Sequence, residues 1–162
     1  MKSDKTKLKK ILLEHVLIYA KVKAIDKFWK SSCSTCQRYD HRTLWQWWHF
    51  VPQSKGDSTR FELDNVNLQC SWCNGRSNQW EQYKHWLYIN ANFWQWRADE
   101  IREQANHIKK RSMTDLEKAI RQVQDLIIEV YVSMTQDQQE IFIDYCSKLH
   151  RKSLMRSLLS QI

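Results

Sequence analysis

The sequence predicts an α+β protein that is mostly α-helical, with one small hairpin-and-helix (ββα) core held together by four cysteines. Only two glycines and one proline occur among 162 residues, so the many tight turns of a β-sandwich or β-barrel are not available. Apolar residues instead recur at steps of three and four over much of the chain, which is the period of amphipathic helices. The length suits one domain with helical additions.

No apolar segment approaches the roughly 20 residues of a membrane span, and the N-terminus leads into an amphipathic segment rather than a signal-peptide core. We therefore expect a soluble cytoplasmic protein that does not bind membranes.

Residues 1–30 are predicted to form a basic amphipathic helix. They carry nine lysines against three acidic residues, a net charge of +6 within a total of +8. The apolar stripe would cover the core, and the opposite face would present basic side chains to a polyanion such as nucleic acid. The side chains expected on that face are Lys9, Lys10, Lys21, Lys23 and Lys27.

Residues 31–96 are predicted to form the core, in the order cysteine pair, hairpin, cysteine pair, helix. The aromatic-rich stretch 43–51 ends before Pro52, which is typical of a strand, and residues 59–63 are predicted to return as its partner. A helix should follow from residue 74 to about residue 92. Its buried side is expected to carry Tyr83, Trp86, Leu87 and Ile89.

Residues 97–162 are predicted to form a helical extension, with helices at about 97–111, 115–133 and from 136 to the end. Two capping-box patterns mark helix starts, Thr114 with Glu117 and Thr135 with Gln138. The apolar stripes of these helices are typical of an intramolecular core, and a pair of such helices also suits a dimerisation surface.

Four of the five cysteines form two C-x-x-C pairs, Cys33 with Cys36 and Cys70 with Cys73. Two such pairs can close a tetrahedral zinc site, and a reducing compartment favours metal ligation over disulfides. We therefore expect structural zinc. Cys146 lies apart in a helical stretch, where a buried thiol acting as a small apolar residue is expected.

His49 and Asn74 are the candidate catalytic residues, and Asn65 is counted with them in a supporting role. Hydrolysis of a phosphodiester requires a base to activate water and a divalent cation to neutralise charge on the phosphate. His49 follows Cys36 by thirteen residues on the predicted hairpin, and Asn74 directly follows Cys73 at the start of the predicted helix. In a ββα arrangement both would point into one cleft.

The pattern around these residues resembles the NinG, or Rap, recombination endonucleases of lambdoid phages, and more distantly phage endonuclease VII. The resemblance covers about residues 33–101, with a weaker continuation at 98–101, and its most specific part is the run from Arg60 to Asn74. The matching residues are Cys33, Cys36, Trp45, His49, Phe50, Arg60, Phe61, Asn65, Gln69, Cys70, Cys73, Asn74, Asn78 and Tyr83.

The resemblance implies an HNH-like fold and a structure-specific DNA endonuclease that acts on branched DNA such as Holliday junctions and D-loops. It implies that His49 is the general base, that Asn74 binds a catalytic magnesium or manganese ion, and that the four cysteines hold zinc. Asn65 would brace the hairpin through hydrogen bonds. A resolvase that nicks two opposed strands needs two active sites, so a homodimer is expected.

The sequence departs from the family pattern at one metal ligand. HNH sites usually have an acidic residue directly before the histidine, and NinG-like sequences have an aspartate three positions before it, where this chain has Trp48 and Gln46. A neutral amide alone is a weak ligand for magnesium. Either another carboxylate substitutes or the site is weakened or inactive, and the candidates are Asp40, Asp57, Glu62 and Asp64. The pair Asp40-His41 is the alternative to His49 as the working motif.

Basic and aromatic residues near the predicted cleft are the candidate DNA contacts. Trp47 shares a strand face with His49 and is the candidate for stacking on an exposed base. The candidate phosphate contacts are Lys55, Arg60, Arg76 and Lys84. Two other functions remain open: a non-catalytic zinc module that binds branched or single-stranded nucleic acid or a recombination protein, and an interaction adaptor that works through its C-terminal helices.

Overall fold

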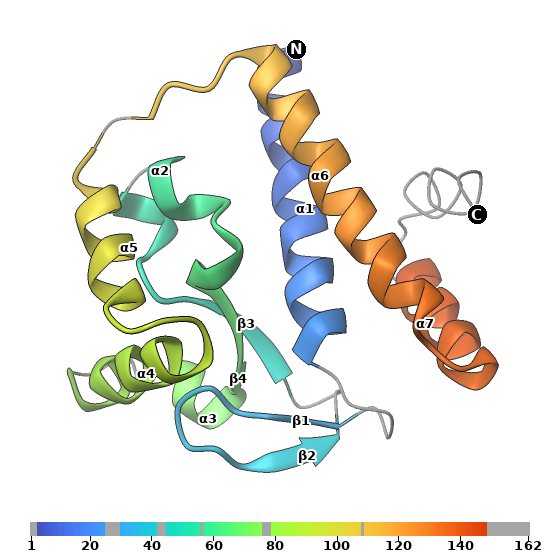
Figure 1. The fold of residues 1–162 in the computed structure, drawn as a ribbon, viewed down its shortest axis with the longest axis horizontal. Helices are drawn as coiled ribbons and strands as arrows, with labels where there is room; N and C mark the ends of the chain where they lie inside the picture. Colours follow the sequence, from blue (N-terminus) through green and yellow to red (C-terminus); the bar gives the residue numbers. More distant parts are fainter. Residues whose placement is uncertain are drawn as a thin grey trace.

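The computed structural model describes residues 3–24, 30–41, 45–55, 57–75, 79–107 and 109–148. Helices predominate in these ranges, with two separate two-stranded antiparallel sheets (Figure 1), which confirms the prediction of a mostly helical α+β protein. No helix within them is both long enough and apolar enough to cross a membrane.

Helix α1 (Asp4–Ala24) lies between α6 (Met113–Val132) on one side and strand β4 (Val66–Cys70) on the other (Figure 1). Together with α7 (Gln136–Lys148), α1 and α6 build the main apolar core. The predicted stripe of α6 is buried at four positions, and Cys146 of α7 is fully buried in the same core, as expected for an apolar role. The N-terminal helix and the C-terminal extension therefore pack on each other.

The first sheet pairs β1 (Lys30–Ser32) with β2 (Tyr39–His41), and the first cysteine pair lies in the turn between them. The prediction that the N-terminal helix reaches about residue 30 is wrong at its end. Lys30 already belongs to β1, because the backbone of 30–32 pairs with 39–41 and needs extended geometry.

The second sheet pairs β3 (Trp45–His49) with β4 (Val66–Cys70) in a register that sets Trp47 opposite Leu68 and His49 opposite Val66. The predicted partner strand at 59–63 is wrong. The connection between the two strands instead contains three short helices, η2 (Gln53–Lys55), α2 (Asp57–Arg60) and η3 (Leu63–Asn65), and residues 59–63 belong to the last two and the turn between them. The carbonyl of Thr59 accepts a turn hydrogen bond from the Glu62 amide at 3.1 Å, which closes a turn where a strand was expected.

Three helices follow β4: α3 (Ser71–Asn74), α4 (Gln79–Asn92) and α5 (Arg97–Ala105). Helix α4 buries a narrow stripe, with His85 and Ile89 fully enclosed. Ile89 packs in one cluster with Phe50 and Val51, which follow β3, and with buried residues of α5. The expectation that Tyr83 and Leu87 are buried is wrong, because they are 49% and 44% exposed on the outer side of the helix.

The remaining helix ends differ modestly from the prediction. Helix α5 ends at Ala105 rather than near residue 111. Helix α6 starts with a capping box between Ser112 and Asp115, two residues before the predicted one. The capping hydrogen bonds between Thr135 and Gln138 at the start of α7 confirm the second box. The predicted continuation of this helix beyond residue 148 lies outside the described residues.

Candidate metal centre and candidate active site

The four paired cysteines meet at one point. Their sulfur atoms all lie within 4.8 Å of one another, and the Sγ atoms of Cys36 and Cys70 are 3.9 Å apart. Four thiolates at 2.3 Å from a tetrahedral zinc ion would be about 3.8 Å apart, whereas a disulfide would need about 2 Å. The donor set and its spacing are compatible with a structural zinc site.

Secondary structure brings the two pairs together. Cys33 and Cys36 lie in the turn of the β1–β2 hairpin, Cys70 ends β4, and Cys73 lies in α3. Only Cys36 is exposed. A metal ion held by all four would therefore join the first hairpin to the end of the second and to the helix that follows it.

The thiol of Cys33 lies in a setting that favours the thiolate. Its burial raises its pKa, but backbone hydrogen bonds from Cys36, Cys70 and Thr35 outweigh burial, and the net effect lowers the pKa of Cys33. The amide nitrogens of Cys70 and Thr35 lie 3.4 and 3.5 Å from this sulfur. Burial raises the pKa values of Cys36 and Cys73. Because a metal ligates thiolates, binding at this cluster would release protons.

Gln69 joins the cluster to the strand and was not singled out for this role from the sequence. It is fully buried on β4, and its amide donates a hydrogen bond to the hydroxyl of Thr35, between the first two cysteines. The available signal was its position directly before Cys70, within the run 60–74.

His49 ends β3 and is only 9% exposed. Its Nε2 lies 3.3 Å from the carbonyl oxygen of Arg60 and must donate, since a carbonyl only accepts. Its Nδ1 then accepts from the side-chain amide of Gln53 at 3.3 Å. Burial lowers the pKa of His49, which keeps the ring neutral at pH 7. The result is an oriented neutral imidazole whose acceptor nitrogen contacts the exposed side chain of Gln53.

Asn65 braces the segment that carries His49, a role that the resemblance implies. It is fully buried, and its Oδ1 accepts from the amide of Val51 at 2.7 Å. Its Nδ2 donates to the carbonyl of Val51 at 3.1 Å and to that of Thr59 at 2.9 Å. The Asn65 side chain thus links the segment just after β3 to Thr59, at the start of the 59–65 turn, while Asn65 itself lies at the end of that turn.

Asn74 ends α3, and its amide nitrogen donates to the side-chain oxygen of Gln46 on β3. Side chains alternate along a strand, so Gln46 and His49 belong to opposite faces of β3. The contacts therefore keep Asn74 with Gln46 rather than with His49, and the single cleft expected from the sequence is not formed by them.

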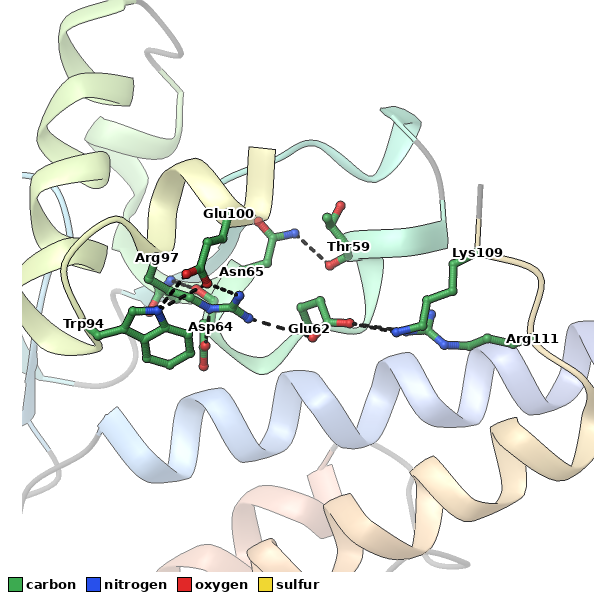
Figure 2. A network of polar contacts seen from close by, with 10 residues as sticks. Thr59, Glu62, Asp64, Asn65, Trp94, Arg97, Glu100, Lys109 and Arg111 are labelled. Atoms are coloured by element: carbon green, nitrogen blue, oxygen red, sulfur yellow. Dashed lines mark hydrogen bonds and ion pairs between the residues drawn. The ribbon is translucent and has the colours of Figure 1, made fainter. Parts of the chain in front are cut away.

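Two of the four candidate carboxylates are bound to cations (Figure 2). Asp64 accepts from Arg97 at 2.8 Å, and Glu62 lies 3.4 Å from Arg111 and 3.5 Å from Lys109. Asp40 and Asp57 have side chains outside the described part, so their candidacy stays open. Glu62 and Asp64 are thus held in a structural network and not directed at His49 or Asn74.

The candidate DNA contacts lie in different settings. Lys55 is exposed on η2, Arg60 is half-buried at the end of α2, and Lys84 lies on α4 with its ammonium 5.2 Å from the Trp80 ring centre. Arg76 is outside the described residues.

Trp47 is half-buried, and its indole N–H donates to the carbonyl of Leu17 on α1 at 2.8 Å. The Lys21 ammonium lies 5.5 Å from the Trp47 ring centre and 4.7 Å from that of Tyr145. Trp47 therefore joins β3 to α1, and Lys21, at 8% exposed, is buried between helices. The expectation that Lys21 faces phosphate is wrong; Lys27 lies outside the described residues.

Comparison of the chain with protein-family models, with curated protein sequences and with solved structures finds no match.

Proposed function

We propose that the protein is a zinc-stapled, metal-dependent endonuclease of the NinG type that cuts branched DNA in the bacterial cytoplasm. The observation that carries the proposal is the setting of His49. This imidazole is held neutral, donates one N–H to a backbone carbonyl and presents its other nitrogen as an acceptor. A general base that abstracts a proton from water needs this arrangement.

The chain's own residues would divide the work as follows. His49 Nδ1 accepts the proton of the attacking water once the exposed Gln53 amide gives way. Asn65 keeps the imidazole in place through its three backbone hydrogen bonds. The cysteine cluster holds zinc and fixes α3 to the hairpin. The excess of basic residues attracts the phosphate backbone.

A magnesium or manganese ion would supply the charge neutralisation that the hydrolysis needs. The bond to Gln46 uses the nitrogen of Asn74, so its oxygen is the atom that a hard cation would take. Because Gln46 and His49 belong to opposite faces of β3, the proposal requires Asn74 to leave Gln46 when DNA and the cation bind. Paired incision of two strands would also require a homodimer.

The second candidate is a zinc module that binds branched or single-stranded nucleic acid without cutting it. The pairing of Asn74 with Gln46 favours it, as does the engagement of Glu62 and Asp64 by cationic side chains. With these side chains engaged elsewhere, His49 has no acidic partner in the contacts that the structure describes.

Cleavage of a labelled four-way junction with magnesium or manganese separates the two candidates. We expect the wild type to cut the junction and His49→Ala to cut it at least about 100-fold more slowly, the usual loss when a general base is removed. The exposed His107 provides a matched control, since His107→Ala should cut like the wild type. Equal cutting by His49→Ala would refute the role of His49. Tight junction binding without any cutting would favour the non-catalytic module.

A further inference from the structure

Helix α4 carries three aromatic rings in a row on its outer side: Trp80, Tyr83 and Trp86, here called the aromatic ladder. The ring centres of Trp80 and Tyr83 are 5.9 Å apart with planes 29° from parallel. Those of Tyr83 and Trp86 are 6.0 Å apart and only 10° from parallel. These are offset stacks, in which each ring supports the next.

The ladder is anchored at one end, and its other end is exposed to solvent. The indole of Trp86 is partly buried and donates to Asp99 of α5 at 2.9 Å. Tyr83 is 49% exposed and Trp80 59% exposed. The core face of α4 is already filled by His85 and Ile89. The two outer rings are therefore not needed for the core, and adjacent large aromatics left in water usually mark a binding surface.

A cation accompanies the exposed end. The Lys84 ammonium lies 5.2 Å from the ring centre of Trp80, one helical turn away. A lysine ammonium over a tryptophan ring at the protein surface is a weaker contact than an aromatic ring on a nucleobase. A base that stacks on Trp80 can therefore displace Lys84 from the ring and leave its ammonium beside the adjoining phosphate.

We propose that the aromatic ladder is a stacking platform for unpaired DNA bases, with Lys84 as its phosphate contact. The proposal rests on the nucleic-acid-binding half of the proposed function and names the feature of branched DNA that this surface recognises. The flat rings can stack on a base, and the Lys84 ammonium at their exposed end can pair with the phosphate of that nucleotide. The chain's net charge of +8 also favours binding of a polyanion. Helix α4 also follows the cysteine cluster closely in the chain, since Trp80 lies seven residues after Cys73.

Two oligonucleotides of equal charge test the proposal. One is a thymidine oligomer of about fifteen nucleotides, within the size range of single-strand sites. The other is an abasic oligomer with the same number of phosphates. Wild-type protein should bind the thymidine oligomer at least about tenfold more tightly, as measured by fluorescence anisotropy at fixed salt. Trp80→Ala/Tyr83→Ala should lose that preference and still bind the abasic oligomer like the wild type.

Matched variants control for folding and for charge. Trp80→Phe/Tyr83→Phe keeps the rings and should retain most of the preference, and Val132→Ala, an exposed apolar residue on α6, should retain all of it. Unchanged thymidine binding by the double alanine variant, or equal binding of both oligomers by the wild type, would overturn the proposal. A dimer that the double alanine variant converts to monomer in sedimentation, with thymidine binding intact, would assign the ladder to contacts between copies instead.

Failure of the ladder and failure of the nuclease are separable. If junctions stay uncut but the double alanine variant loses thymidine binding, the ladder stands and catalysis falls. If junctions are cut and that variant binds the thymidine oligomer normally, the nuclease stands and the role of the ladder is refuted.

Discussion

At the scale of single residues, His85 is the most unusual feature of the core. It is fully buried on α4, with its ring 5.5 Å from that of Phe50 and 6.2 Å from that of Tyr88. Neither ring nitrogen has a hydrogen-bond partner in the described part of the chain. Burial alone lowers the pKa of His85 from 6.5 to about 3. The folded protein therefore holds this ring neutral, although protonating it is easy once the chain unfolds.

This difference predicts how stability depends on pH. Because the pKa of His85 is lower in the folded state, the unfolded chain binds an extra proton below about pH 6.5. Stability from this source is present above that pH and is lost, by at most about 1.4 kcal/mol per pH unit, as the pH falls from 6.5 toward 3. In His85→Phe this loss should disappear, so its free energy of unfolding should fall less than that of the wild type between pH 7 and pH 5. Urea denaturation at each pH measures the difference.

Ile89→Val is the matched control for the histidine variant. Ile89 is also fully buried on α4. Removing one methylene should cost about 1 kcal/mol at every pH and leave the pH dependence unchanged. A His85→Phe protein with the same pH dependence as the wild type would show that His85 is protonated or solvated in the folded state.

Asn65 is a residue whose structural role was predicted before the structure was known. Its position in the motif that resembles the NinG-like enzymes implied a brace, and its three buried hydrogen bonds supply one. Trp47 shows the opposite case. Strand alternation correctly placed it on the face of His49, but only the packing of α1 on that face shows that its indole is bound to Leu17.

At the scale of elements, one charged network fastens α5 and the 109–111 connection to the turn before β4 (Figure 2). Arg97 lies at its centre with its side chain only 8% exposed, bonded to Asp64 at 2.8 Å and to Glu100 at 3.2 Å. Its guanidinium also lies 4.6 Å from the ring centre of Trp94. These contacts add to the apolar packing of Ala98 and Ile101 in holding the short helix α5 in place.

Arg97→Met should lower the free energy of unfolding by about 3 kcal/mol, because it leaves the partly buried Asp64 without its cation. Adding Asp64→Asn should restore part of the loss, since the two residues are coupled. Lys7→Met is the control: the ion pair of Lys7 with Asp4 has a similar length, 3.0 Å, but is exposed, so its loss should cost less than about 1 kcal/mol. If Arg97→Met and Lys7→Met cost the same, the network is only a set of surface charges. Thermal and urea unfolding of the wild type, Arg97→Met, Arg97→Met/Asp64→Asn and Lys7→Met measure these differences in stability.

At the scale of the whole molecule, the cysteine cluster joins the first hairpin to β4 and α3, beside hydrogen bonds such as that from Gln69 to Thr35. Few buried apolar side chains surround the cluster. Among the described residues, Leu68 is the one other buried apolar residue that packs with Cys33, Cys70 and Cys73. A cluster of this size buries too little apolar surface to hold two short strands by itself. Metal ligation would then supply most of the stability of this region.

We accordingly predict one zinc ion per chain by elemental analysis of the purified protein. Removing it with a strong chelator should lower the melting temperature by more than about 10 °C, because structural zinc contributes directly to folding free energy. Cys36→Ser should bind zinc more weakly and melt earlier, whereas Cys146→Ala, which changes a buried cysteine of α7 outside the cluster, should keep full zinc content. Zinc-free protein with an unchanged melting temperature would exclude a structural metal here.

The features that the amino-acid sequence alone predicts correctly are those set by local spacing. Helical periodicity places α1, α6 and α7, and the two C-x-x-C pairs mark the candidate metal ligands, because each pattern depends on residues close together in the chain. The brace role of Asn65 was instead implied by the resemblance to the NinG-like sequences. Long-range packing settles the rest: the true partner strand of β3, the outward aromatic face of α4, and the capture of Asp64 by Arg97. Which surfaces meet is a property of the whole folded chain, since the same side chain is stabilised in water or in the core according to what packs against it.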